Sequence, residues 1–250
     1  MKITTRQIAL IAIFAALYYI LSLVSPHIPI GIGDVHINLE ALVATVFGLV
    51  LGPYLGTATA FLGALVTWTL SGMSPANFPF LLSPPINALI TGLIYYKKWK
   101  WSFLIFSALI IAFLFTPPVQ PLTENGIVAA AVIFDKLIAL LLILPCVKFA
   151  TKLNVGRGAA FYFLLAFIGN EADNMWGSFI FATPMVYEGI FGMPVDVTRS
   201  LFLVSPFAYP AIRLIQAFIA MLIAVPLMKT LKDTPWLWQK ETVLTPNQQN

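Results

Sequence analysis

The stretch GNEADN, residues 169–174, places two carboxylates and two amides inside an otherwise apolar run. On a helix, side chains three or four positions apart share a face, so Asn170, Asp173 and Asn174 are expected to lie together. Glu171 precedes Asn174 by three positions and shares its edge of the helix. Amides donate and accept hydrogen bonds, and carboxylates accept them. The stretch therefore has the chemistry to hold a small polar ligand.

Carboxylates at this depth need a positive partner. Each ionised side chain at the bilayer centre costs about 2.5–3.5 kcal/mol on insertion scales, so a cation must compensate the acids or they must be protonated. Arg213, at a comparable depth in a later helix, is the expected partner, and Trp176 completes this part of the predicted substrate site. A buried ion pair that only fixes helix packing is the alternative. Asp135 and Lys136 are adjacent, so we expect them to face different directions and rank them as weaker candidates.

The composition indicates a membrane protein. Hydrophobic residues make up 60% of the 250 residues and charged residues 10%, whereas soluble domains carry roughly 25% charged residues. The net charge of +4 does not indicate nucleic-acid binding, because the basic residues cluster at loop ends and form no stripe. A single cysteine, Cys146, excludes an intrachain disulfide.

Apolar runs separated by short polar or Pro/Gly segments predict an all-α integral membrane protein with about eight helices. We expect these helices over residues 5–24, 37–51, 54–71, 83–96, 102–115, 127–147, 159–182 and 204–228. They form one transmembrane domain over residues 1–232, followed by a cytoplasmic tail over 233–250.

The distribution of Lys and Arg predicts the orientation of the bundle. With the N-terminus inside, every basic residue except Lys136, Arg199 and Arg213 falls in a segment on the inner side. Cytoplasmic loops carry such an excess of Lys and Arg. An even number of helices then places both termini in the cytoplasm.

Small residues mark one face of the first helix. Ala9, Ala12 and Ala16 are spaced to share a face, and they let another backbone approach closely. Two interpretations stay open. The face packs against a neighbouring helix of the same chain, or it docks a separate membrane subunit.

Two outer loops supply further candidates. The loop SPHIPIGIGDVHIN contains His27, Asp34 and His36, whose spacing is poor for the three or four converging ligands of a metal site. We interpret this segment as a gating loop over an outward-facing site, and we predict no metal and no cofactor. Asn77 and Asn87 flank a Pro-rich break and are predicted to bind substrate, since non-helical backbone at membrane depth must be covered or line a cavity.

Several motifs together resemble one family. Ala12 and Ala16 match an AxxxA docking motif in a first helix, and GLVLGPYLGTATAFLGAL resembles a GPxxG turn that leads into a small-residue helix. PANFPFLLSPPINALITGLIYYKK resembles the start of the family's fourth helix. FATPMVYEGIFGMP and SPFAYPAIRLIQAFIAMLIAVPLMKTLK resemble the ends of its fifth and sixth helices. The chain thus resembles the substrate-binding S component of energy-coupling-factor (ECF) transporters, the prokaryotic vitamin importers, especially their riboflavin branch.

The resemblance implies a six-helix core, and residues 102–150 are then interpreted as an inserted helical hairpin. It also implies a non-enzymatic subunit of an ABC-type importer in the prokaryotic plasma membrane. That subunit binds a vitamin or a similar small micronutrient near the outer face for ATP-driven uptake. The implied partners are a transmembrane T subunit and two cytoplasmic ATPases. The chain itself has no GxxxxGK[ST] loop for ATP.

Two other function classes remain as alternatives. In a self-sufficient secondary transporter, Glu171 or Asp173 cycles protons, although no inverted repeat is apparent in the sequence. An intramembrane enzyme is not supported, because the sequence shows neither the spacing of metal ligands nor a nucleophile elbow. The substrate itself is not decided, because two acids favour a positive charge or several donors, whereas Arg213 favours an acceptor.

Overall fold

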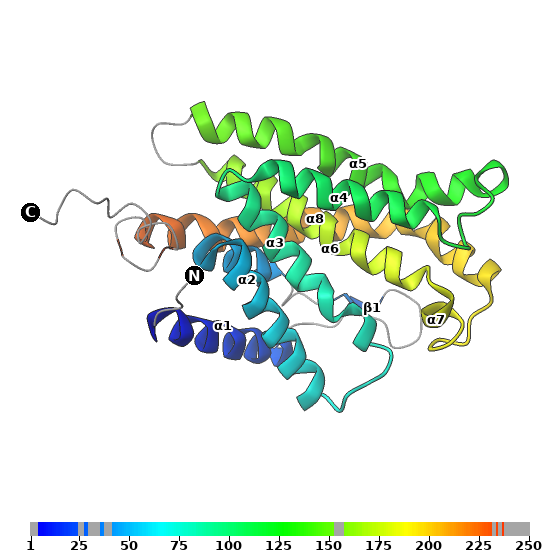
Figure 1. Ribbon diagram of the computed structural model, residues 1–250, viewed down its shortest axis with the longest axis horizontal. Coiled ribbons are helices and arrows are strands. Elements are labelled where there is room, and N and C mark those ends of the chain that lie inside the picture. Colours follow the sequence, from blue (N-terminus) through cyan, green and yellow to red (C-terminus); the bar gives the residue numbers. More distant parts are fainter. Residues whose placement is uncertain are drawn as a thin grey trace, which may run out of the picture.

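The computed structural model describes residues 5–24, 28–29, 36–37, 42–152 and 158–231, together with residues 234 and 237. The described chain is a bundle of helices with one very short pair of strands (Figure 1). The elements are α1 (Thr5–Val24), β1 (Ile28–Pro29), β2 (His36–Ile37), α2 (Val43–Leu70), η2 (Phe78–Leu82), α3 (Ser83–Tyr95), α4 (Trp99–Leu114), α5 (Leu122–Lys152), α6 (Ala159–Phe181), α7 (Pro184–Tyr187) and α8 (Val195–Leu231). This architecture confirms the predicted all-α membrane bundle.

Most of the long helices have the length and hydropathy of membrane spans. Among the described residues, five helical segments qualify: Thr5–Val24, Val43–Leu70, Phe78–Tyr95, Leu122–Lys148 and Tyr209–Leu231. α4 is apolar but has only 16 residues. α6 has 23 residues but is not among the five, because its polar stretch lowers its hydropathy.

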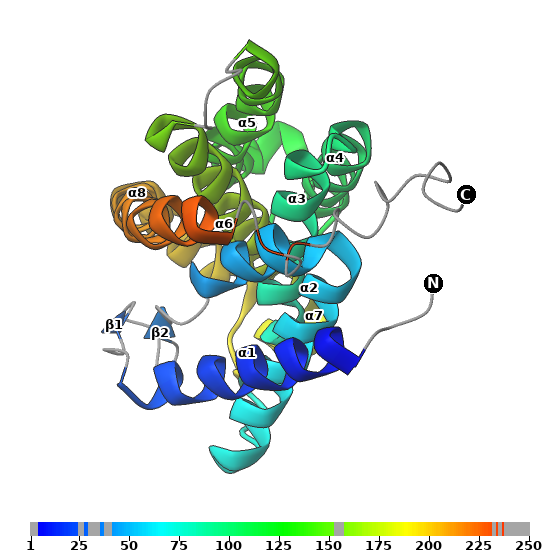
Figure 2. The same cartoon turned by 90° about the vertical axis from the view of Figure 1, so that its left-hand side faces the viewer.

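α6 occupies the middle of the bundle. It packs against α3, α4, α5 and α8, and the end-on view shows it surrounded by these helices (Figure 2). Its neighbours therefore shield its polar side chains from lipid. This placement is what an intramembrane polar helix requires, since ionisable side chains in a membrane face the interior of the bundle.

The predicted helix boundaries differ from the structure most at α2, α5 and α8, and α5 runs from Leu122 to Lys152 where a helix over residues 127–147 was predicted. The two expected helices over residues 37–51 and 54–71 are the halves of α2, and the first half begins only at Val43, after the β1–β2 pair. α8 begins at Val195 instead of near residue 204. Prolines inside α8 do not end it, because neighbouring helices and side chains can satisfy the carbonyls that proline leaves free.

A sharp bend divides α2 and brings its halves together. Gly52 has φ +79°, a conformation that side chains rarely adopt, and Pro53 follows it. A Cβ on Gly56 would lie 2.5 Å from the carbonyl oxygen of Phe47, so the two halves pack backbone to backbone. A Cβ on Gly48 would lie 2.3 Å from a backbone oxygen of α3. The predicted tight turn with close helix packing is confirmed.

α1 lies at the edge of the bundle and packs mainly against α2. Phe14 stacks on Phe47 with ring centroids 5.2 Å apart. Tyr18 is buried against Gly63, where a Cβ would approach its side chain to 2.8 Å. The buried face of α1 is thus the one that carries Tyr18, and it faces α2.

The alanine face of α1 packs against none of the other helices that the structure describes. Ala9, Ala12 and Ala16 are all exposed, whereas Ala15, Tyr18 and Ser22 form the buried face. Intramolecular packing, one of the two interpretations of these alanines, is therefore not what the structure shows. The face is open to another molecule.

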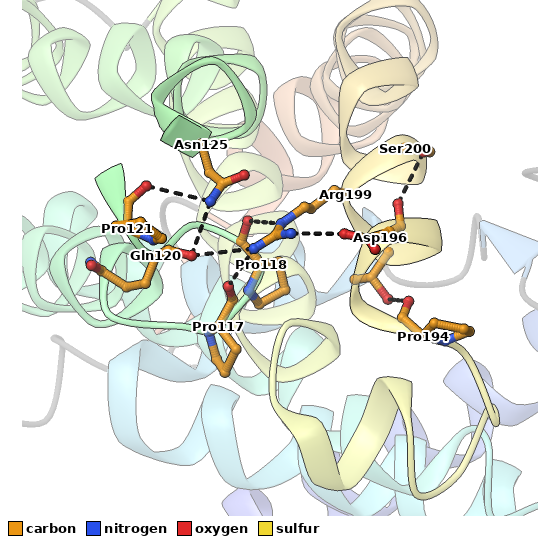
Figure 3. Close-up of polar contacts among 10 residues, drawn as sticks. Pro117, Pro118, Gln120, Pro121, Asn125, Pro194, Asp196, Arg199 and Ser200 are labelled. Atoms are coloured by element: carbon orange, nitrogen blue, oxygen red, sulfur yellow. Dashed lines mark hydrogen bonds and ion pairs between the residues drawn. The ribbon is translucent and has the colours of Figure 1, made fainter. Parts of the chain in front are cut away.

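An arginine ties the α4–α5 connection to the start of α8 (Figure 3). Arg199 donates from Nε to the carbonyl oxygen of Pro118 at 3.0 Å and from Nη2 to that of Gln120 at 3.2 Å. Its Nη1 pairs with Asp196 at 2.8 Å. Arg199, one of the three basic residues outside the predicted inner segments, thus holds the α4–α5 hairpin against α8.

The first helix begins and the last helix ends at the same end of the bundle, on the left in Figure 1. The α4–α5 connection and the start of α8, which Arg199 joins, lie at the opposite end. This arrangement fits an even number of crossings. That the shared end faces the cytoplasm stays a prediction from the distribution of Lys and Arg.

Candidate functional site

The polar stretch of α6 is fully inside the bundle. Asn170, Glu171, Asp173 and Asn174 are each at most 5% exposed. They lie within two turns of α6, with α3 on one side, α5 on another and α8 facing them. Burying groups of this kind is unfavourable unless they are paired, so their partners decide what the site is.

A chain of hydrogen bonds joins α2, α3 and α6. The Thr45 hydroxyl donates to Asn87 Oδ1 at 2.9 Å, and Asn87 Nδ2 donates to Asn170 Oδ1 at 2.8 Å. All three side chains are at most 1% exposed. Asn87, predicted to bind substrate, is thereby placed beside the α6 stretch.

α3 approaches α6 closely at Gly169. A Cβ on this residue would lie 2.4 Å from Asn87 Oδ1 and 2.4 Å from Thr91 Cγ2. Any larger residue would separate the two helices and stretch the contact between Asn87 and Asn170. The glycine that opens the GNEADN motif is thus what allows α3 to reach the polar stretch.

α5 contributes the charged pair of Asp135 and Lys136. The prediction that these two side chains face different directions is wrong. Lys136 Nζ lies 2.9 Å from Asp135 Oδ1 and 3.6 Å from Glu171 Oε2, and the three side chains are at most 5% exposed. Although the two α5 residues are adjacent, the long lysine side chain bends back to its neighbour and also reaches α6. Lys136, rather than Arg213, therefore contacts Glu171.

Arg213 faces the same region from α8. It is 7% exposed, and its Nη1 donates to Gln216 Oε1 at 2.8 Å. Among the described residues Arg213 forms an ion pair with neither Glu171 nor Asp173. Arg213 is thus a nearby cation that leaves both carboxylates without a direct salt bridge to it.

We call these residues the α6 cluster: Asn87, Asp135, Lys136, Asn170, Glu171, Asp173, Asn174 and Arg213. Many of its buried atoms have no hydrogen-bond partner in the part of the chain that the structure describes. They are the donors Asn170 Nδ2, Asn174 Nδ2 and Arg213 Nε and the acceptors Glu171 Oε1, Glu171 Oε2 and Asp173 Oδ2. Such unsatisfied groups are rare in folded proteins and need an explanation.

The unsatisfied atoms have the character of a ligand site. Both donors and acceptors are present, on facing helices, in a region from which water and lipid are largely excluded. A small molecule with complementary donors and acceptors would satisfy them together, as in sites where a few polar groups fix the orientation of a buried ligand. The described residues contain no group of three or more side chains that suits a metal ion.

Other predicted site residues lie elsewhere. Asn77 is exposed, on the turn before η2, and does not join the cluster. Trp176 is half-buried on α6, with its Nε1 also lacking a partner and its ring 6.0 Å from that of Phe179.

The predicted gating loop is described only in part. His36 belongs to β2, where it pairs with Pro29 of β1 in an antiparallel ladder. His27 and Asp34 lie outside the described residues, so the gating role of all three stays a prediction.

Comparison with known proteins decides the family. A family model for the S component of ECF-type riboflavin transporters matches residues 2–133, which is more than half of the 250-residue chain. The chain belongs to this S-component family. Neither a search of curated proteins nor a search of solved structures found a match. The resemblance inferred from the motifs is thereby confirmed, and the S component is a substrate-capture subunit of an ECF importer.

The matched part of the S component stops short of its charged cluster. It runs through α4 into α5 and ends at residue 133. Asp135, Lys136, Glu171, Asp173 and Arg213 all follow. The family match therefore establishes the type of subunit, whereas the chemistry of the cluster has to be read from the structure of this S component. That residues 102–150 are an insertion stays a prediction.

Asn87→Ala is expected to destabilise this S component. Removing the amide leaves Thr45 and Asn170 with unsatisfied buried groups, which costs about 1–3 kcal/mol for each. Thermal unfolding followed by the fluorescence of the six tryptophans measures the change. Asn77→Ala is the matched control and should unfold like the parent, because Asn77 is exposed. Equal stability of the two variants would contradict the hydrogen-bond chain.

Lys136→Met is expected to be more damaging. It leaves Asp135 and Glu171 buried without a contacting cation, and breaking a buried ion pair costs about 3–5 kcal/mol. Adding Asp135→Asn to this variant should recover part of the lost stability, because one uncompensated charge is removed. Lys100→Met, at an exposed position of α4, is the control for the loss of a lysine. A melting temperature for Lys136→Met equal to that of Lys100→Met would show that the pair is not formed.

Proposed function

We propose that this S component captures a vitamin or a similarly small micronutrient in the α6 cluster, near the outer face of a prokaryotic plasma membrane. The observation that carries the proposal is the set of buried donors and acceptors on α6 and α8 that have no hydrogen-bond partner among the described residues. A protein that only needed an ion pair to fix its helices would satisfy these atoms internally. A protein that has to hold a polar substrate leaves them available to it.

Uptake then depends on partner proteins. In this proposal a transmembrane T subunit binds the S component, and two cytoplasmic ATPases drive release of the substrate into the cell. Both termini lie in the cytoplasm, in line with the distribution of Lys and Arg. The exposed alanines of α1 form the surface on which the T subunit docks, since small residues let helices approach closely.

Native mass spectrometry tests substrate capture. The chain is expressed alone in a host grown on rich medium and purified in detergent. We expect the protein to retain a small molecule of vitamin-like mass, and we expect Glu171→Gln combined with Asp173→Asn to lose it. Riboflavin, which the family name suggests, is the first compound to compare in mass. An empty parent protein, or a double variant that keeps the compound, would contradict the proposal.

The docking surface is tested by co-purification. Ala12→Leu combined with Ala16→Leu fills the alanine face, so we expect the S component to lose its co-expressed T and ATPase subunits. Its own melting temperature should stay unchanged, because both alanines are exposed. Ala130→Leu, at an exposed position of α5, adds the same bulk elsewhere and should leave the complex intact. Retention of the partners by the alanine-face variant would place the docking surface elsewhere.

A self-sufficient proton-coupled transporter is the second candidate. The observation in its favour is that Glu171, wholly buried, lies beside a lysine that also contacts Asp135. Buried acids near a cation are a common feature of proton relays in membranes. Purified protein in liposomes distinguishes the two functions. Uptake of the co-purified compound, driven by a pH gradient without partner proteins, would favour the transporter, whereas a dependence on the T and ATPase subunits would favour the S component.

A further inference from the structure

Lysine and tryptophan side chains gather at the turn between α3 and α4. The sequence from Lys97 to Trp101 reads KKWKW. The turn lies at the end of the bundle where α1 begins and α8 ends, on the left in Figure 1. Lys97, Lys100 and Trp101 are exposed, Trp101 to 60%. The turn therefore presents positive charge and an aromatic ring to whatever surrounds the protein at this end.

Lys97 has a backbone conformation that favours glycine. Its φ is +65°. The Lys97 N–H donates to the carbonyl oxygen of Ile94 at 3.1 Å, and the Lys98 N–H donates to that of Leu93 at 2.7 Å. Helices that end with this pair of bonds usually have glycine where this chain has Lys97, because a side chain strains the backbone there. A lysine kept at a strained position indicates that its charge has a function.

The bend of α2 lies beside this turn. Lys98 Nζ is 5.1 Å from the centre of the Tyr54 ring and 3.5 Å from its hydroxyl oxygen. A Cβ on Gly92 of α3 would lie 2.7 Å from Pro53 Cα, so the bend and the end of α3 are in close contact. Tyr54 is 53% exposed. These residues form one surface, which we call the α3–α4 turn surface: Tyr54, Lys97, Lys98, Lys100 and Trp101.

An apolar stripe on α4 continues the α3–α4 turn surface. The exposed residues on this face of the helix are Trp101, Leu104, Ala108 and Ile111. Lys100 precedes Leu104 by four positions and therefore lies at the start of the same face. A ligand with a charged head and an apolar tail could contact the lysines and the stripe together.

The length of α4 brings lipid headgroups to the lysines. α4 has 16 residues, so it is about 24 Å long, which is less than the roughly 30 Å of the apolar core of a bilayer. Around a short span the bilayer becomes thinner, and flanking side chains extend to the headgroups. The headgroups next to α4 therefore lie within reach of Lys97 and Lys100.

We propose that the α3–α4 turn surface binds the headgroup of an anionic phospholipid, in the leaflet at the end of the bundle where α1 begins. The lysines attract the negative headgroup, and the stripe of α4 contacts an acyl chain. Each Lys near a membrane surface strengthens binding to anionic lipids, and Trp and Tyr are enriched at the level of the headgroups. A soluble acidic partner would use the lysines but not the apolar stripe. The site shares no residue with the α6 cluster and goes beyond substrate capture.

Lipid titration followed by native mass spectrometry tests the proposal. The full chain in a neutral detergent is titrated with phosphatidylglycerol, which is anionic, and with phosphatidylcholine, which is zwitterionic and carries the same acyl chains. We expect phosphatidylglycerol to bind about tenfold more tightly. Lys97→Gln combined with Lys100→Gln should lower its affinity about tenfold or more, because two attracting charges are removed.

A charge-matched control distinguishes a site from the general charge of this end. Arg6→Gln combined with Lys229→Gln removes the same charge at exposed positions of α1 and α8, and it should bind phosphatidylglycerol like the parent. Equal binding of the two lipids by the parent, or equal losses in the two double variants, would overturn the proposal. Normal lipid binding by the lysine variant, together with loss of co-expressed T and ATPase subunits, would also overturn it and assign the surface to a protein partner.

Lys97→Gly separates the role of the charge from that of the turn. Glycine suits a φ of +65°, so we expect this variant to melt at or above the temperature of the parent in detergent. We expect it nevertheless to bind phosphatidylglycerol about fivefold more weakly, because one lysine is missing. Unchanged lipid binding by the folded variant would overturn the proposal.

Discussion

A polar side chain inside an apolar bundle must find a partner there, and this constraint organises the α6 cluster. Water and lipid cannot satisfy a carboxylate or an amide at the centre of the protein, so helices that meet α6 have to bring donors and acceptors with them. α3 brings Asn87 and α5 brings Lys136. Several atoms on α6 and α8 are nevertheless left without partners. The pairing holds the helices in place, and the unpaired remainder makes the cluster suited to a substrate.

Small residues in the bundle allow the helices to come close enough for this pairing. α3 can reach α6 only because Gly169 has no side chain, and α2 can reach α3 only because of Gly48. The bend at Gly52 folds α2 on itself and brings Thr45 to the hydrogen-bond chain that ends on Asn170. Backbone geometry far from the acids thus determines which polar atoms of α6 are satisfied. The exposed alanines of α1 are different, because they face away from the bundle and are free to meet another helix.

Much of this could be predicted from the sequence, and the exceptions have physical reasons. Four polar side chains in an apolar run are unmistakable, so the burial of the GNEADN stretch was predictable, as was the bend at Gly52 and Pro53. The contact of Lys136 with Glu171 could not be predicted. The positions of two residues on a helix fix the directions of their Cβ atoms, but the end of a long, flexible lysine side chain can bend to another neighbour. The early start of α8 was missed because its first residues are no more apolar than a loop. Local patterns do not show which neighbour α6 acquires, since this depends on how distant helices pack.

The hairpin of α4 and α5 contributes to the charged cluster. α5 lies on the outside of the bundle, yet it supplies the cation nearest to Glu171. At the far end, Arg199 ties the α4–α5 connection to the start of α8 through backbone carbonyls. The hairpin is therefore joined to the two helices that carry the rest of the charged cluster. A substitution of a charged residue in the hairpin would therefore change the net charge of the α6 cluster without altering any residue of α6.

An experimental structure of the purified chain with its retained small molecule would show whether the α6 cluster is the substrate site. We expect the molecule to lie against α6, with polar atoms within about 3.2 Å of Glu171, Asp173 or Asn174. The donors and acceptors that lack partners in the protein would then be satisfied by it. A molecule bound elsewhere, with the α6 cluster paired within the protein itself, would contradict the claim that this cluster is the substrate site.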